Sequence, residues 1–192
     1  MCPGAMAMEA ANEDIVHLNS DLLLLACDSK SGRHILKLLG AQSNVIRRIA
    51  AAKSAAIGTA IRCGVPLVSF SPRLDDLLIP STSISRGVGK QEVPEPLRHL
   101  TVQTFHVAQR LALIDRTVAQ LHFGFTPRAS EVFRNLSAKR ILQLSEGHGV
   151  LLRLRAAAKP LVWDGLFIGE RCQGPRAFRI SQHSGRQNLG NE

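Results

Sequence analysis

Apolar residues recur at alternating steps of three and four along the middle of the chain, which is the pattern of a helix that packs lengthwise against a neighbouring helix. This heptad stripe consists of Leu97, Leu100, Val107, Leu111, Ile114, Val118 and Leu121. Only Thr104 interrupts it. Gly124 closes the run, since glycine adopts the left-handed conformation that ends a helix. The sequence therefore predicts one long helix from Leu97 to about Gly124.

Two short helices and an extended segment are predicted next. Thr126 followed by Pro127 is typical of an N-cap and the first residue of a helix, which would continue to Leu136. Ser137 would cap a second helix over 138–146. The segment 150–155 then alternates, with Leu152 and Leu154 expected to point inward and with Arg153 and Arg155 expected to point outward.

Within these residues the chain resembles the FlhD family of bacterial flagellar transcriptional regulators. The motifs that carry the resemblance are Val107-Ala-Gln-Arg-Leu-Ala-Leu-Ile-Asp115, Phe123-Gly124, Leu136-Ser-Ala-Lys-Arg-Ile-Leu-Gln-Leu-Ser-Glu146 and Leu152-Arg-Leu-Arg155. Their order and spacing match the family without a gap over about sixty residues. One departure concerns Leu152, which stands where the family often has a cysteine, so the resemblance implies no disulfide between subunits at this position.

The first half of the chain looks like a second copy of this unit. Its apolar positions Ile15, Leu18, Leu22 and Leu25 repeat the spacing of Leu97, Leu100, Thr104 and Val107, and Gly40 matches Gly124. The segment 65–70 stands where the extended segment of the second half stands. We therefore expect an all-α chain with two FlhD-like units in tandem, each with a pair of helices similar to a helix-turn-helix and a short extended segment. The units would span 12–79 and 97–168, with a Pro/Gly-rich linker over 80–96.

Caps and breakers define the helices that we expect in the first unit. They are a helix from Glu13 to Ala26 capped by Asn12, one from His34 to Leu39, a third capped by Ser43, a fourth opened by Ser54, and a short helix within 71–79. At the end of the second unit, the apolar segment 161–168 is expected to pack onto the rest of that unit. Residues 169–192 are polar and basic without periodic apolar residues, which predicts a disordered tail.

Positive charge is concentrated in the second half. Residues 1–96 carry ten Lys/Arg against nine Asp/Glu, whereas residues 97–192 carry fourteen against six. Such a surplus suits the phosphate backbone of DNA, because attraction to a line of charge grows with the number of cations presented. The other interpretation is a solvated basic face that serves solubility. The candidate DNA-binding residues are Arg128, Arg134, Lys139, Arg140, Gln143, Arg153, Arg155 and Lys159, of which Lys139, Arg140 and Gln143 could read bases if 138–146 were a recognition helix.

The two apolar stripes predict contact between the units. Both stripes are narrow and would remain exposed in separate units, so we expect an intramolecular pseudo-dimer, with a homo-oligomer as the other way of covering them. The expected interface consists of Leu18, Leu22 and Leu25 from the first unit and Leu97, Leu100, Val107, Leu111, Ile114, Val118 and Leu121 from the second.

The sequence shows no motif for a metal site, no arrangement of catalytic residues and no membrane-spanning segment. The four cysteines, at positions 2, 27, 63 and 172, form no C-x-x-C pair, so we expect no zinc site, no disulfide framework and a reducing cytoplasm. Their scatter also separates the chain from FlhC, the FlhD partner, whose zinc site would need a cysteine cluster. We find no arrangement of catalytic residues, expect no cofactor, and find no run long enough to span a membrane.

The resemblance implies a transcription regulator. In the family, FlhD joins FlhC to activate promoters of flagellar operons, and related pairs activate transfer genes of conjugative elements. We therefore expect an activator subunit that contacts DNA together with an FlhC-like partner, which would supply most base contacts. Two alternatives stay open. One is an antagonist that mimics FlhD and sequesters the partner without touching DNA, and the other is an independent helix-turn-helix repressor.

Overall fold

The fold is known from a computed structural model that describes residues 3–28, 31–78 and 92–168. In the first half it contains α1 (Pro3–Cys27), α2 (Gly32–Leu38), α3 (Ser43–Ala51), α4 (Ser54–Ile61), β1 (Val68–Phe70) and α5 (Arg73–Leu78). In the second half it contains α6 (Glu95–Ile114), α7 (Arg116–Phe123), α8 (Pro127–Arg134), α9 (Ala138–Gly147), β2 (Leu152–Leu154) and α10 (Pro160–Ile168). The prediction of a mostly helical chain is confirmed.

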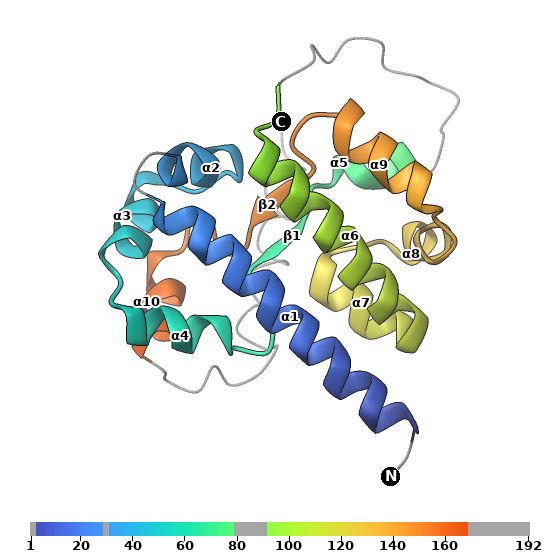
Figure 1. Cartoon of the computed structure of the whole chain (residues 1–192), viewed down its shortest axis with the longest axis horizontal. Helices are drawn as coiled ribbons and strands as arrows, with labels where there is room; N and C mark the ends of the chain where they lie inside the picture. The colour runs from blue at the N-terminus through green and yellow to red at the C-terminus, as the bar shows by residue number, and fades with distance from the viewer. Residues whose placement is uncertain (1–2, 29–30, 79–91, 169–192) are drawn as a thin grey trace, which may run out of the picture.

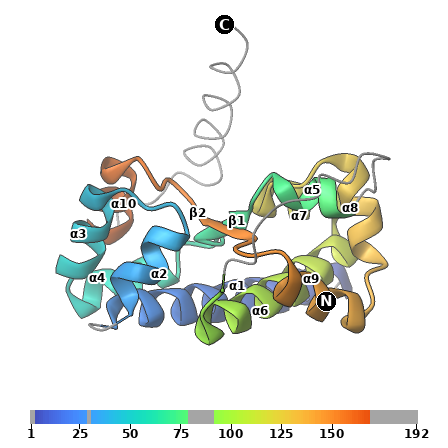
Figure 2. The ribbon, with the colours of Figure 1, turned by 90° about the horizontal axis from the view of Figure 1, so that it is seen from above.

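The same order of elements occurs in both halves, with four helices, a three-residue strand and a last helix. The strands β1 and β2 pair antiparallel between the two helical groups, as Figure 2 shows. Their register sets Val68 against Leu154 and Phe70 against Leu152. The two halves therefore meet around a local pseudo-two-fold axis that passes through the strand pair.

The long helices α1 and α6 lie side by side along one face of the molecule (Figures 1 and 2). They run antiparallel: Asp14, near the middle of α1, pairs with Arg110 late in α6, at 2.6 Å between Oδ2 and Nη1, whereas the later Asp21 meets the earlier Gln103. Further along the seam, Gln103 Nε2 donates to Asp21 Oδ2 at 2.9 Å. The seam between the two predicted stripes is therefore formed by these two helices within one chain.

Each half buries an aromatic side chain that the other half supplies. Phe70 of β1 stacks against Phe125 and lies 4.8 Å from Phe105 between ring centroids, inside the group formed by α6, α7 and α8. In the opposite direction, α10 packs on α3 and α4, where its Trp163 is fully buried. The expectation that segment 161–168 packs onto the second unit is therefore wrong, because the chain crosses to the first-half helices after β2.

The predicted long helix is interrupted at Asp115. This residue has extended dihedrals, φ −147° and ψ 108°, and its carboxylate accepts hydrogen bonds from the backbone N–H of Thr117 at 2.8 Å and Val118 at 3.1 Å. Because an aspartate that caps a new helix ends the preceding one, α7 turns away from the α1–α6 seam. Val118 is only half-buried and Leu121 remains 38% exposed. Both residues lie on α7, beyond the end of α6, so the predicted stripe does not continue along the α1–α6 seam.

Several predicted boundaries agree with the structure and others do not. Thr126 and Ser137 are N-caps, and Gly124 has φ 79° in the left-handed region, as predicted. Asn12, in contrast, lies inside α1, which begins at Pro3, and Ser43 is the first residue of α3, whose N-cap is Gln42. Of the predicted linker, 80–91 lies outside the described residues and Glu95 already belongs to α6, while the predicted tail 169–192 also lies outside them. None of the described helices is long and apolar enough to cross a membrane.

Candidate nucleic-acid interface

Helices α8 and α9 begin with side-chain caps that fix where each helix starts. Thr126 Oγ1 accepts a hydrogen bond from Ala129 N at 3.1 Å, and Ser137 Oγ accepts one from Arg140 N at 3.3 Å. Both capping residues have extended backbone, so the chain turns sharply before each helix. Only residues 135–137 separate the two helices, which is the short connection expected between the helices of a helix-turn-helix.

A single glutamine of α6 holds this connection. Gln109 Nε2 lies within hydrogen-bonding distance of three main-chain carbonyl oxygens, those of Phe133 at 3.3 Å, Arg134 at 3.2 Å and Leu136 at 2.8 Å. The last carbonyls of a helix have no partner in its own hydrogen-bond ladder. Here the Gln109 amide bonds to the last two carbonyls of α8 and to that of Leu136, and Phe133 O also accepts from Leu136 N at 3.2 Å. Helices α8 and α9 each pack against α6 and touch each other little. Their relative placement therefore depends on α6.

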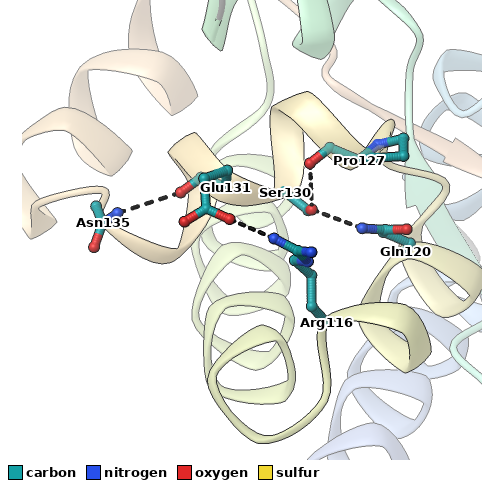
Figure 3. A network of polar contacts seen from close by, with 6 residues as sticks. All are labelled: Arg116, Gln120, Pro127, Ser130, Glu131 and Asn135. Carbon is teal, nitrogen blue, oxygen red and sulfur yellow. Dashed lines mark hydrogen bonds and ion pairs between the residues drawn. The ribbon is translucent and has the colours of Figure 1, made fainter.

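The start of α8 is tied to α7 by the polar network drawn in Figure 3. Gln120 Nε2 donates to Ser130 Oγ at 2.8 Å, and this hydroxyl in turn donates to the carbonyl of Pro127 at 2.8 Å. On the exposed side, Arg116 forms an ion pair with Glu131 at 2.5 Å. With α6 behind it and α7 beside it, α8 is fixed on two sides.

The outer face of α9 is open to solvent. Its buried face consists of Ile141, Leu144 and Ser145, which pack inward. The exposed side chains on the opposite face are those of Lys139, Arg140, Leu142, Gln143 and Glu146. This face therefore combines two cations, one amide, one carboxylate and a leucine that is 50% exposed.

The other candidate residues differ in exposure. Arg128 at the start of α8 and Arg153 in β2 are exposed, whereas Arg134 and Lys159 are half-buried. Arg153 Nε donates to Ser69 Oγ at 3.2 Å, so the base of this side chain is held on the strand pair.

The charges of Arg128, Lys139 and Arg140 are not neutralised by a neighbour. Within 3–28, 31–78 and 92–168, no ion pair involves any of these three side chains. The described ion pairs engage Arg48, Arg98, Arg110 and Arg116 instead. The open cations of the second half therefore remain available for an external anion.

Arg155 corrects the predicted alternation of the extended segment. Its side chain was expected to point outward to phosphate, but the residue is only 7% exposed. Its Nη2 donates to the carbonyl of Leu121 at 3.1 Å and to that of His122, at the end of α7. Burial, and secondly the charge of Arg153, lowers the pKa of Arg155 to about 10, so the side chain stays charged at neutral pH. It stabilises the negative end of the helix dipole and is not a DNA contact.

Most of the predicted seam residues are covered. Leu18, Leu22, Leu97, Leu100 and Leu111 are buried. Leu25, Val107 and Ile114 are half-buried against the core. Thr104, which interrupts the stripe, and Thr101, which the apolar pattern did not include, are also buried, and their hydroxyls donate to carbonyls one turn earlier at 2.7 Å.

Asn19 is another buried residue that periodicity alone does not identify. It is fully buried in α1. Its amide nitrogen donates to the carbonyls of Ile61 at 3.2 Å and Val65 at 2.9 Å, and its amide oxygen accepts from Leu67 N at 2.8 Å. These bonds tie α1 to the turn before β1. The sequence signal for its burial was its position directly after Leu18, a residue of the apolar stripe.

No protein-family model, no curated protein and no solved structure matches the chain. Among the described residues, no group of three or more His, Cys, Asp and Glu side chains could hold a metal ion. The exposed polar groups of the α8–α9 surface include the cations of Arg128, Lys139 and Arg140 and the amide of Gln143, beside the carboxylate of Glu146. Cations and amides are among the groups with which proteins bind phosphates and base edges, whereas a carboxylate repels phosphate.

Proposed function

We propose that this chain is an FlhD-like subunit of a transcription-regulating complex, in which one chain supplies what two FlhD-like units would supply together. Its second half contacts the DNA backbone, and an FlhC-like partner supplies most of the contacts to bases. The expected class is an activator of flagellar or conjugative-element genes.

Support for the family comes from what its motif residues do in the fold. Gln109 bonds to the carbonyls between α8 and α9, Arg110 pairs with Asp14 across the seam, and Asp115 caps α7. These three polar residues belong to the stretch in which the resemblance is sharpest. Each organises a helix junction, which gives a physical reason for a polar residue at that position in a helical motif.

The observation that carries the DNA contact is the pair of unneutralised cations on α9. Lys139 and Arg140 are exposed and make no ion pair within the described residues. At the corresponding positions of α4 the chain has Ala55 and Ala56. The two halves share an order of elements but differ in charge, and the difference falls on an open helix face. Binding of such a face to the DNA backbone is favourable, because each cation that binds a phosphate releases a condensed counterion.

The packing of the last helices also distinguishes the two halves. Helix α10 packs on both α3 and α4, whereas the shorter α5 packs on α8 and touches α9 little. The α9 face therefore stays open while its α4 counterpart is partly covered. We therefore orient the chain with α9 toward the DNA, so that the open face of the more basic half meets the phosphates.

The antagonist is the second candidate, and one observation favours it. Leu142 is 50% exposed in the middle of the α9 face, where it lies among Lys139, Arg140 and Gln143. A phosphate backbone gains little from an exposed leucine, whereas a protein partner would bury it. An α9 face that binds only protein would make the chain a competitor for the partner.

Co-purification with candidate FlhC-like proteins tests this proposal, followed by DNA binding of the partner with and without the chain. A regulator subunit raises the affinity of the partner for promoter DNA and remains in the shifted complex. An antagonist releases the partner from DNA. Sequence-specific binding by the chain alone would favour the independent repressor, and absence of any complex with an FlhC-like protein would contradict the FlhD-like assignment.

A further inference from the structure

Two rows of unlike side chains run along the exposed face of α9. Residues four apart in a helix lie one above the other on the same face. Ala138 and Leu142 are exposed and form an apolar row, in which Leu142 is 50% exposed. Lys139 and Gln143 are exposed and form a polar row beside it. The first two turns of α9 therefore present an apolar edge and a hydrogen-bonding edge next to each other.

The other exposed side chains of α9 limit where DNA can approach. Arg140 lies about 100° further round the helix than Lys139, on the flank that is turned away from the apolar row. Glu146 lies one turn after Gln143, near the end of the helix. Because its carboxylate repels phosphate, the first two turns are the part of this face that suits DNA.

The repeat of the chain shows that the two rows belong to the second half. With Ile57 of α4 matched to Ile141 of α9, the four row positions are occupied in α4 by Ser54, Ala55, Gly58 and Thr59. None of these residues has a long apolar side chain or an amide group. The rows therefore occur on the helix that carries the two open cations and are absent from its counterpart.

The major groove of DNA offers groups that match the two rows. There an A·T pair presents the methyl group of thymine beside the N7 acceptor and the amino group of adenine. Apolar side chains contact the methyl group, and a glutamine amide forms two hydrogen bonds with the adenine edge. A G·C pair carries no methyl group in the major groove. An apolar row beside a glutamine thus fits A·T pairs better than G·C pairs.

We propose that the first two turns of α9 enter the major groove and prefer A·T pairs. This inference rests on the proposed function, because it assigns a base preference to the same face of α9. Ala138 and Leu142 contact thymine methyl groups, Gln143 bonds to adenine, and Lys139 and Arg140 bind phosphates beside them. Leu142, which a phosphate backbone alone leaves exposed, is covered in this arrangement.

The preference concerns a type of base pair and not one promoter. Selection of a single site typically requires affinities at least about a thousandfold above non-specific binding, which two or three base contacts do not supply. The chain therefore still depends on its partner for promoter recognition, and a modest preference for A·T pairs does not make it an independent repressor.

Deoxyuridine differs from thymidine only by the lack of the methyl group, which makes it the probe for Leu142. Fluorescent duplexes of about two helical turns, one of alternating A·T pairs and one of alternating A·U pairs, are titrated with the full chain at low salt and followed by anisotropy. Both present the same phosphates, so their salt slopes should be equal. The A·T duplex should bind about fourfold more tightly for each methyl group that Leu142 covers. Leu142→Ser should bind the two duplexes equally.

Two further variants separate the two rows from general effects of substitution. Leu113 is an exposed leucine of α6, at 60% exposure, and Leu113→Ser should discriminate between the duplexes as the wild type does. Gln143→Ala should keep the preference for thymine over uracil. Its preference for alternating A·T over alternating G·C pairs should fall by about fivefold or more, because the two hydrogen bonds to adenine are lost.

The failure of this inference differs from the failure of the proposed function. Equal binding of the A·T and A·U duplexes by the wild type, with a steep salt slope, would overturn the base preference and leave backbone contact standing. Discrimination retained by Leu142→Ser would also overturn it, since another side chain would then meet the methyl group. Binding of neither duplex in a salt-dependent way would contradict both. Loss of the partner from Leu142→Ser in co-purification, with both duplexes bound as by the wild type, would place Leu142 against a protein instead.

Discussion

Ser69 and Arg153 occupy equivalent positions in the two halves and pair directly with each other, in the strand register and through a hydrogen bond of 3.2 Å from Arg153 Nε to Ser69 Oγ. The same holds for Asp21 and Gln103 in the long helices, which are equivalent when Ile15 is matched to Leu97 and which meet at 2.9 Å. Residues that pair with their own equivalents lie on a two-fold axis. The chain thus places two copies of one helical pattern around an internal axis.

One consequence of this arrangement is that neither half completes its own core. Phe70 lies against Phe105, Phe123, Phe125 and Phe133 of the second half, with ring centroids between 4.8 Å and 6.0 Å from its own. Phe70→Ala should therefore destabilise the second-half core by about 3 to 5 kcal/mol. Denaturant unfolding should show one cooperative transition at a lower midpoint. Separate transitions for the two halves would contradict this exchange of core residues.

Leu111 and Leu113 offer a matched test of the α1–α6 seam. Leu111 is 1% exposed, and an unpaired charge at that position costs several kcal/mol, so Leu111→Asp should unfold or open the chain. Leu113, two residues later on the same helix, is 60% exposed, and Leu113→Asp should change stability by less than about 1 kcal/mol. Melting and hydrodynamic radius distinguish the two. A Leu111→Asp protein with wild-type melting would mean that this face of α6 is in solvent.

Substitution of Gln109 should lower the stability of the fold by removing hydrogen bonds and not by changing apolar packing. Removal of its amide in Gln109→Ala takes the side-chain donor from the carbonyls of Phe133, Arg134 and Leu136, of which only that of Phe133 keeps a backbone donor among the described residues, and this should cost about 1 to 3 kcal/mol. Gln143→Ala, at an exposed position of α9, is the control and should melt as the wild type does. Hydrogen exchange should be faster at the start of α9 in the Gln109 variant. If both variants melted alike, the connection would not depend on Gln109.

His122 predicts a pH dependence of stability. Burial, and secondly the charge of Arg155, lowers its pKa from the ordinary 6.5 to about 4. The folded state therefore disfavours protonated His122, and the stability that the neutral form contributes is complete above pH 6.5 and is lost as the pH falls toward 4. The loss should be about 1 to 3 kcal/mol. His122→Gln should flatten this part of the stability curve, and an unchanged curve would mean that His122 titrates normally.

Local chemistry in the sequence predicted the caps of α8 and α9 and the helices that they open, but not the starts of α1 and α3. Thr126, Ser137 and Gly124 act at a range of a few residues, so their side chains or backbone suffice to determine the turn. The break at Asp115 was missed because Ile114 and Val118 continue the heptad spacing across it. The spacing of apolar residues shows which side chains would share one face of a helix. It does not show whether the backbone between them stays helical.

The long-range features could not be predicted for a different reason. The pattern of 161–168 shows an apolar helix but does not say which helices it meets, and Trp163 is buried against α3 and α4 after the chain crosses over. For Arg155, alternation along a strand predicted an outward side chain. Its guanidinium instead reaches the end of α7, an interaction between elements that no local pattern encodes.

The salt dependence of DNA binding by the partner complex is the sharpest test of whether α9 meets the DNA backbone. Lys139→Glu with Arg140→Glu should weaken binding and flatten the slope of log affinity against log salt by about 0.9 for each phosphate that the variant no longer neutralises, or about two units for both. Arg47→Glu with Lys53→Glu makes the same change of charge at exposed positions of the first half and should leave the slope as in the wild type. Anisotropy titrations of a promoter fragment at several salt concentrations give all three slopes. An unchanged slope for the α9 variant, or equal flattening by both variants, would contradict DNA contact through the open basic face of the second half.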